Sequence, residues 1–305
     1  MFEDLFSKKG LSLDRLRSFL AFAEAGSIAK AAPRDVTLQS QISRQIGELE
    51  TFFGTELTQR RGKVLSLSES GKRLALLVRQ QLQDLDDFRR EQLLLKRSFT
   101  VGAGASILDW IVIPALPALG GALSNSSLRL ETSRSAALVE AVKDGRVDFA
   151  IVRDDAIPQS LPRILVHQLS FHLCVPRSLL KPGTSVRSLS DSSVLQGLPF
   201  AAGKDGGQLN TAVRQAMQAA GIDFQPTVEC TSLLQLKQLI EQGTCAGVLP
   251  SIGIRGLSRK LIHTCEFEPL QEYSRSLVLH WNERQMLRRG VERTVIRHVA
   301  KALVA

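Results

Sequence analysis

The chain has 305 residues, 44% of them hydrophobic, and a mean hydropathy of +0.01, values that fit a globular protein of two or three domains. No apolar run approaches the roughly 18 residues of a membrane span, and the acidic start at Glu3 and Asp4 is unlike a signal peptide, so we expect a cytoplasmic protein without membrane contact. The net charge of +9 by itself favours a nucleic-acid partner only weakly, because +4 falls in residues 1–97 and +5 in residues 98–305.

Residues 12–67 are predicted to form a small helical unit. Ser12 is a candidate cap for a first helix, whose apolar residues recur at helical spacing. A second, short helix follows the candidate cap Ser27 and stops at Pro33, because proline cannot continue the helical hydrogen-bond ladder. A third helix begins near Thr37. Its apolar face predicts four buried residues: Ile42, Ile46, Leu49 and Phe53.

A hairpin and a long helix are predicted next. The hairpin is hinged at Arg61-Gly62 and carries three cations and no acid, and the helix begins at Ser68. An apolar stripe follows this helix: Leu74, Leu77, Val78, Leu82, Leu85 and Phe88. The stripe could pack on its own domain. Because the flanks of the helix are charged, we favour a two-helix dimer seam.

Residues 98–305 alternate between predicted strands and helices, beginning with a strand at 99–103 and a helix at 106–119. This order implies parallel sheets with helices on their faces. The later elements divide into two similar halves, and we expect each half to have its own sheet.

Several segments are more specific than their periodicity. Residues 23–32 read AEAGSIAKAA, residues 39–50 read QSQISRQIGELE, and 53–57 and 67–71 read FGTEL and LSESG. Together with Arg60-Arg61-Gly62, these motifs resemble the LysR-type transcriptional regulator family over about 50 residues. Segments 141–151 and 243–250 resemble the same family in the rest of the chain.

The resemblance implies an α/β protein with an N-terminal all-α winged helix-turn-helix and a C-terminal pair of α/β subdomains similar to type 2 periplasmic binding proteins. The DNA-binding domain would span 1–67, the linker and dimerisation helix 68–97, and the effector-binding domain 98–305. Within the effector-binding domain we expect subdomain I at about 98–168 and 270–305, and subdomain II at about 169–269.

The sequence departs from the family pattern at a few positions. Residues 33–36 (PRDV) replace the usual continuation of the second helix, which puts the geometry of the turn in doubt. Ser40 replaces a common proline, and Gly47 stands where a polar or basic residue is usual, at a cost of about 1 kcal/mol in helix propensity against alanine. Cys245-Ala246 replaces Gly-Ile. None of these changes removes a charge needed for DNA contact.

The third helix is the predicted recognition element, because a helix fits the major groove and its first turns meet base edges. Gln39 could pair with adenine and Arg44 with guanine or a phosphate. The predicted contacts of this region are Ser27, Thr37, Gln39, Ser40, Ser43, Arg44 and Gly47. In the wing, contacts to phosphates or the minor groove are expected from Arg60, Arg61 and Lys63. The alternative is a solvated helix face and a solvated hairpin.

The effector is expected between the two α/β halves, outside the carboxyl ends of their strands. Helix N-termini with hydroxyl groups attract anions, so the sequence predicts a small organic anion. The predicted contacts are Ala105, Ser106, Ser133, Arg134, Ser135, Ala202, Gly203, Lys204 and Gly247. Simple helix capping is the alternative for the serines.

Catalytic, cofactor and metal motifs are missing from the sequence. Residues 102–107 lack the third glycine of a dinucleotide loop, 203–207 lack the order of a P-loop, and no G-x-S-x-G elbow occurs. The four cysteines are widely spaced and are expected to be ordinary buried thiols, with a redox pair of Cys230 and Cys245 left open. We therefore expect no enzyme activity, no cofactor and no metal.

The expected partners are double-stranded DNA, a small-molecule effector and a second copy of the chain bound through the linker helix, with further assembly into a tetramer. The α/β pattern also occurs in two other classes of protein. A solute-binding protein is excluded by residues 1–67, and an α/β enzyme fused to a DNA-binding module would need a catalytic group that the motifs do not supply.

Overall fold

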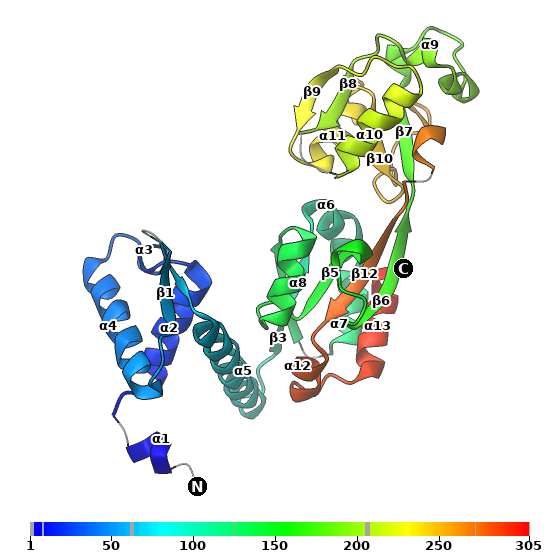
Figure 1. Ribbon diagram of the computed structural model, residues 1–305. Coiled ribbons are helices and arrows are strands. Elements are labelled where there is room, and N and C mark those ends of the chain that lie inside the picture. Colours follow the sequence, from blue (N-terminus) through cyan, green and yellow to red (C-terminus); the bar gives the residue numbers. More distant parts are fainter. Residues whose placement is uncertain are drawn as a thin grey trace. The chain divides into compact units, whose positions relative to one another are not determined.

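The computed structural model describes residues 3–7, 9–61, 64–124, 126–204, 208–271 and 273–304. The chain divides into two compact units, Met1–Leu95 and Lys96–Ala305, called here the first and the second unit (Figure 1). The predicted linker helix belongs to the first unit.

The first unit is a helix-turn-helix followed by a two-stranded wing and a long helix. Its elements are α1 (Glu3–Ser7), α2 (Leu13–Ala25), α3 (Ile28–Ala31), α4 (Val36–Phe53), β1 (Thr58–Arg61), β2 (Val64–Leu67) and α5 (Glu69–Gln92). The predicted caps Ser12 and Ser27 are confirmed, since their hydroxyl groups accept hydrogen bonds from backbone N–H groups of α2 and α3. Ser68, where the long helix was expected to begin, caps α5 in the same way.

The core of the first unit lies between α2, α4 and the wing. Phe19, Phe22, Leu49 and Leu57 are at most 1% exposed, and the predicted Ile42 and Ile46 are also buried. The prediction for Phe53 is wrong, because its side chain is 38% exposed. It is the last residue of α4 and contacts the ring of Phe52 edge-on instead of entering the core.

The apolar stripe of α5 is divided along the helix. Leu74 and Val78 are buried in the core of the first unit, and Leu82 packs against it. Leu77, Leu85 and Phe88 are 53–63% exposed. The prediction of one continuous exposed seam is therefore wrong for the beginning of the helix, where the stripe stabilises its own domain.

The second unit contains a mixed five-stranded sheet, in the order β4-β3-β5-β12-β6. Its strands are β3 (Arg97–Ala103), β4 (Ser126–Thr132), β5 (Phe149–Arg153), β6 (Arg163–Leu169) and β12 (Arg275–Trp281). β3 is parallel to β4 and β5, whereas β12 is antiparallel to β5 and β6. The expected all-parallel sheet is wrong, because the chain comes back from the other half through β12. We call this sheet and its helices the first lobe.

The helices of the first lobe lie on both faces of the sheet (Figure 1). They are α6 (Ala105–Ile107), the π-helical η1 (Leu108–Val112), α7 (Ile113–Ala122), α8 (Ser135–Lys143), η2 (Asp154–Ala156), α12 (Glu283–Arg288) and α13 (Arg293–Val304).

The second lobe holds the remaining strands in two small sheets. An antiparallel sheet has the order β10-β7-β11, and β8 pairs in parallel with β9. These strands are β7 (Phe171–Pro176), β8 (Phe200–Gly203), β9 (Pro226–Cys230), β10 (Gly247–Pro250) and β11 (Ile262–Glu266). The helices are η3 (Arg177–Leu179), η4 (Val186–Ser190), α9 (Ser192–Leu195), α10 (Gln208–Ala219), α11 (Leu233–Glu241) and η5 (Glu268–Leu270). The sequence patterns did not predict β6 or β11.

A buried ion pair fixes the C-terminal helices to the first lobe. Arg289 Nη1 lies 2.6 Å from Asp148 Oδ1, and the two side chains are only 1% and 8% exposed. Asp148 also accepts hydrogen bonds from Thr100 N and Gln285 Nε2, and Arg289 donates to Ser98 O. Because removing one partner of such a pair costs about 3–5 kcal/mol, this network makes the lobe rigid.

One helical stretch among the described residues is long and apolar enough to cross a membrane by length and composition. It is Ala105–Ala122, with a mean hydropathy of 1.5. Asp109 interrupts this stretch, so it is not a continuous apolar run. Leu108, Ile111, Val112 and Leu119 from this stretch are buried in the core of the second unit.

Two helical glycines of the first unit should respond oppositely to alanine. A Cβ on Gly47 in α4 would meet nothing within 4 Å, so Gly47→Ala should stabilise the unit by about 1 kcal/mol. A Cβ on Gly71 in α5 would lie 2.0 Å from Leu57 O, so Gly71→Ala should destabilise it by roughly 1–3 kcal/mol.

Circular dichroism during urea unfolding measures this difference. Trp110 and Trp281 are the only tryptophans and both lie in the second unit, so their fluorescence is the internal control and should not change. Equal effects of the two substitutions would contradict the packing of α5 against Leu57.

Candidate nucleic-acid interface and effector site

Helix α4 begins with a side-chain cap that the sequence patterns missed. Asp35 Oδ1 accepts a hydrogen bond from Leu38 N at 2.8 Å, and the helix starts at Val36, one residue before the expected Thr37. In the preceding turn Arg34 has φ 62°, an uncommon conformation for a residue with a side chain. The departure from the family pattern at 33–36 thus yields a tight turn and a capped helix.

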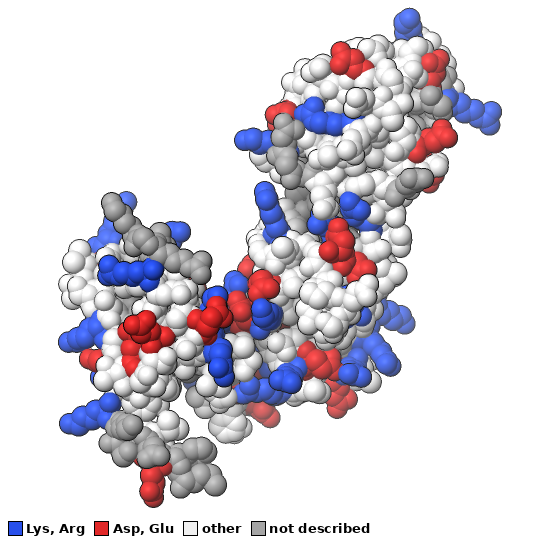
Figure 2. Space-filling model, in the orientation of Figure 1, with Lys and Arg blue, Asp and Glu red and all other residues white. Residues whose placement is uncertain are grey.

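The face of α4 opposite the core is polar and exposed. Thr37, Ser40, Ser43 and Arg44 are all exposed, and the Arg44 side chain keeps 73% of its surface accessible. Arg44 Nε lies 3.8 Å from Glu48 Oε1, an exposed contact of little energy. The structure therefore brings these four predicted residues together on one surface. Figure 2 shows cations, with acidic side chains among them, along the side of the first unit that carries α4 in Figure 1.

Gln39 has a different arrangement from the one expected. Its Nε2 donates a hydrogen bond to Ala32 O at 2.8 Å, and its side chain is half-buried. The amide holds α4 to the end of α3. This bond uses one of the two Nε2 hydrogens, so the predicted two-bond contact with adenine, through Oε1 and the other hydrogen, stays a prediction.

The remaining predicted DNA contacts have mixed positions. Ser27 caps α3 through Lys30 N at 3.2 Å, which uses its hydroxyl as an acceptor. Gly47 faces open space, and Arg60 is exposed on β1. The side chain of Arg61 and all of Lys63 lie outside the described residues, so their contacts stay predictions.

The wing is joined to α4 by one carboxylate that the sequence patterns did not single out. Glu50 Oε1 accepts hydrogen bonds from Leu57 N at 2.8 Å, Thr58 N at 3.0 Å and Thr58 Oγ1 at 3.0 Å. Hydrogen bonds to a charged group are stronger than neutral ones, so Glu50 fixes the direction in which the wing leaves the helix.

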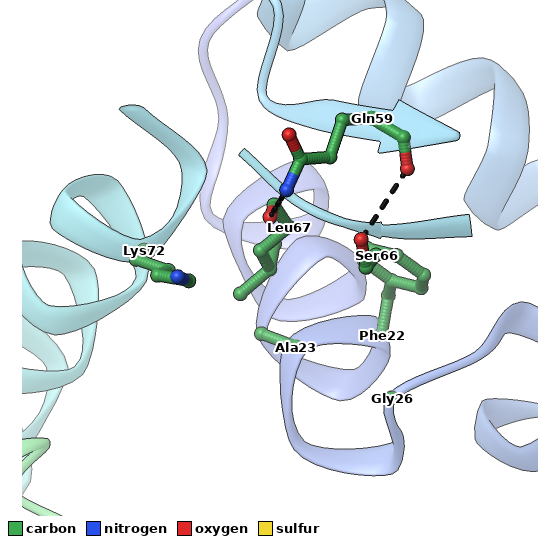
Figure 3. Close-up of a pocket in the computed structure, with 7 residues that line it drawn as sticks. All are labelled: Phe22, Ala23, Gly26, Gln59, Ser66, Leu67 and Lys72. Carbon is green, nitrogen blue, oxygen red and sulfur yellow. Dashed lines mark hydrogen bonds between the residues drawn. The ribbon is translucent and has the colours of Figure 1, made fainter. Parts of the chain in front are cut away.

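A pocket of about 330 Å³ lies beside the wing (Figure 3). Gln59 Nε2 donates to Leu67 O at 3.0 Å along its side. The pocket is lined by Phe22, Ala23, Gly26, Gln59, Ser66, Leu67 and Lys72. None of the predicted DNA contacts lines it.

In the second unit, the predicted serines do not serve as the expected caps. The N-cap of α6 is Gly104 and that of α8 is Arg134, and neither helix has a side-chain cap. Ser106 and Ser133 are half-buried, and Ser135 Oγ accepts a hydrogen bond from Arg153 N at 3.3 Å. The alternative that these serines simply cap the helices is therefore wrong, and Ala105 is exposed beside them.

The predicted effector contacts of the second lobe differ in how exposed they are. Lys204 is exposed, and its backbone N donates to Cys230 O at 2.7 Å. Ala202 is buried, and Gly203 is half-buried at the end of β8. Gly247 is buried where a Cβ would lie 2.8 Å from Leu236 Cδ1, so packing against α11 explains this glycine.

The cysteines do not form a disulfide pair. Cys230 pairs with Gly203 at one edge of β8, whereas Cys245 precedes Ala246, which bonds to the other edge. All four cysteines are free thiols in this structure. Burial raises the pKa of the Cys230 and Cys245 thiols, and it raises the pKa of Cys174 to about 12. All three are therefore poor nucleophiles at neutral pH.

No group of His, Cys, Asp or Glu that could hold a metal ion is found among the described residues.

The exposed polar face of α4, the anchored wing and the two α/β lobes define a DNA-binding protein with a separate ligand-sensing unit.

The comparisons with protein families give the class more exactly. The family of bacterial regulatory helix-turn-helix proteins, lysR family, matches residues 13–72, and the LysR substrate binding domain matches residues 92–303. The chain belongs to the LysR family and is a DNA-binding transcriptional regulator with an effector-binding domain.

Known relatives are also transcriptional regulators. The chain is 27% identical to the probable nitrogen assimilation transcriptional activator of Synechococcus elongatus over 80% of both chains. It is 29% identical to the regulator PecT of Dickeya dadantii over 50% of both chains.

Solved structures share the fold. Full-length OxyR from Pseudomonas aeruginosa has 18% identity and a TM-score of 0.63, with 97% of this chain and 95% of that chain covered. Full-length CbnR in complex with its target DNA has 18% identity and a TM-score of 0.55, with 96% and 100% covered.

Proposed function

We propose that α4 reads base edges in the major groove of double-stranded DNA. The observation that carries this proposal is the row of exposed side chains Thr37, Ser40, Ser43 and Arg44 on the face of α4 that the core leaves free. Arginine can bind guanine O6 and N7 together, and serine can bind either type of base. Arg60 on the wing would add a phosphate contact, and we keep Arg61 and Lys63 as proposed contacts beside it.

We further propose that two copies of the chain associate through the exposed end of α5. Leu77, Leu85 and Phe88 are large apolar side chains that the first unit does not cover. A second copy of the same helix would cover them in a coiled-coil contact, and further contacts would give a tetramer. A dimer fits a DNA site with two half-sites.

The second unit is proposed to bind a small organic anion in the region of Ser106, Ser133, Ser135 and Lys204. The half-buried hydroxyls do not cap their helices, and the positive ends of helix dipoles favour an anion. Binding would change how the two lobes contact each other and so change the DNA complex. This activity needs no catalysis, and we infer that the protein acts in the cytoplasm, where its DNA is.

Arg44→Ala should leave the chain folded and lower its affinity for DNA selected by the native protein about 5- to 150-fold. This range corresponds to roughly 1–3 kcal/mol for the loss of one two-bond base contact. A gel-shift titration measures the affinity. Arg284→Ala, which removes an exposed arginine of the second unit, is the control and should bind like the native chain. Unchanged affinity and sequence preference of Arg44→Ala would refute the assignment.

Leu85→Glu combined with Phe88→Glu should convert the dimer to a monomer in sedimentation experiments, because two charges would enter the proposed contact. Leu82 is avoided because it packs in its own unit. Leu261→Glu changes an equally exposed leucine of the second unit and should have no effect. An unchanged dimer in the double variant would show that α5 is not the seam.

Organic anions should raise the melting temperature of the second unit, followed by tryptophan fluorescence. The screen compares acetate, succinate, benzoate and larger carboxylates with sodium chloride at the same ionic strength, so that salt screening is controlled. A screen in which only neutral or cationic compounds stabilise the native chain would refute an anionic effector.

A further inference from the structure

Two arginines in the second unit converge on one oxygen atom. Arg153 Nη1 donates a hydrogen bond to Gln208 Oε1 at 2.6 Å, and Arg275 Nη2 donates to the same atom at 3.5 Å. Arg153 ends β5 and Arg275 begins β12, which are neighbouring antiparallel strands of the first lobe. Gln208 begins α10 in the second lobe. The contact therefore joins the two lobes through side chains.

The charges at this contact are not balanced. Arg153 Nε lies 3.0 Å from Asp155 Oδ1, in an ion pair whose side chains are 35% and 45% exposed. Arg275 has no carboxylate partner among the described residues, and its Nη1 donates only to Ser274 O at 3.3 Å. The Nε atom of Arg275 is buried and makes no hydrogen bond with a described residue, whereas that of Arg153 faces the Asp155 carboxylate. Two guanidinium groups thus share one neutral acceptor where a charged acceptor would bind more strongly.

Aromatic packing holds Arg275 in place. Its guanidinium carbon lies 3.9 Å from the centroid of the Tyr273 ring, and Tyr273 contacts the buried Phe171 with ring centroids 5.2 Å apart. A guanidinium stacked on a ring loses little freedom when it binds an anion. The helix α10 also begins at Gln208, which adds the positive end of its dipole at the same point.

We propose that Arg153 and Arg275 together bind a carboxylate group of the effector, and that the Gln208 carboxamide occupies the carboxylate position in this structure. A carboxamide has the planar shape of a carboxylate but lacks its charge, so a ligand carboxylate would replace it and gain charge-assisted hydrogen bonds. A tetrahedral phosphate matches this position less well. Replacement would release Gln208 and with it this contact between the lobes.

This inference rests on the proposed function that the second unit binds an organic anion, and it names the group that is recognised. It extends the predicted site, because Arg153 N donates to Ser135 Oγ at 3.3 Å. The pair Arg153 and Arg275, called here the arginine clamp, therefore lies next to one of the predicted serines.

Gln208→Glu tests the proposal without a ligand, because it supplies the carboxylate within the full-length chain. Both tryptophans lie in the second unit, so fluorescence melting reports its stability. We expect Gln208→Glu to raise the melting temperature by about 3 °C. Gln215→Glu makes the same chemical change at an exposed position of α10 and should shift the temperature by less than about 1 °C.

An acid in the first turn of a helix is favourable by itself, so Gln208→Glu is also made in chains that carry Arg275→Gln or Arg153→Gln. If both arginines bind the new carboxylate, the increase in melting temperature caused by Gln208→Glu should fall by at least half in each of these two chains. Arg275→Gln removes only weak contacts and should fold. An equal rise in all three backgrounds, or no rise in the native one, would overturn the proposal.

If Gln208→Glu gives the wrong result in these three backgrounds, the proposal of an anionic effector is not affected, because the screen of organic anions uses the native chain and does not depend on which residues bind them. If the screen of organic anions fails, the arginine clamp is still supported as a contact within the protein. The DNA-binding proposal is measured separately and with neither set of variants.

Discussion

The burial of one face of α4 is the constraint on which the DNA-binding unit depends. Ile42, Ile46 and Leu49 are at most 3% exposed, and a helix that buries one face has only the opposite face to offer a partner. The Asp35 cap sets where this helix begins, and Glu50 fixes the wing to its last turns. A single packed helix therefore sets the direction of both the proposed recognition surface and the wing.

The second unit combines rigid lobes with a polar contact between them. The buried pair of Asp148 and Arg289 would be costly to break, so it holds the first lobe in one arrangement. The contact of Arg153 with Gln208 is half-exposed, so Arg153 can exchange the Gln208 oxygen for an oxygen of a ligand at little cost. A ligand that competes for this contact could change how the lobes meet without disturbing either core, and such a differential interaction is what ligand control requires.

Local features of the structure could be predicted from the sequence, and features that join distant segments could not. Ser12, Ser27 and Ser68 cap the helices that follow them, because a cap depends only on the next three residues. The exposure of Phe53 and the division of the α5 stripe depend on where neighbouring elements end. The direction of β12 depends on the path of the chain through the other lobe.

The candidate site follows the same rule. The exposed polar face of α4 was predictable because Ser40, Ser43 and Arg44 occupy one side of a single helix. The tie between Gln39 and Ala32 was not, because it depends on the unusual turn at 33–36. The arginine clamp was not predictable either, since Arg153 and Arg275 lie 55 and 67 residues from Gln208 in sequence and meet only in the folded unit.

We propose that Arg44 is the residue through which α4 reads the major groove. The most direct test replaces single guanines by 7-deazaguanine, which lacks the N7 acceptor, in DNA selected by the native protein. We predict that replacement at one or two guanines in each half-site weakens binding of the native chain but has no further effect on Arg44→Ala. If 7-deazaguanine does not weaken binding of the native chain, or weakens binding of the native chain and of Arg44→Ala equally, the role of Arg44 is contradicted.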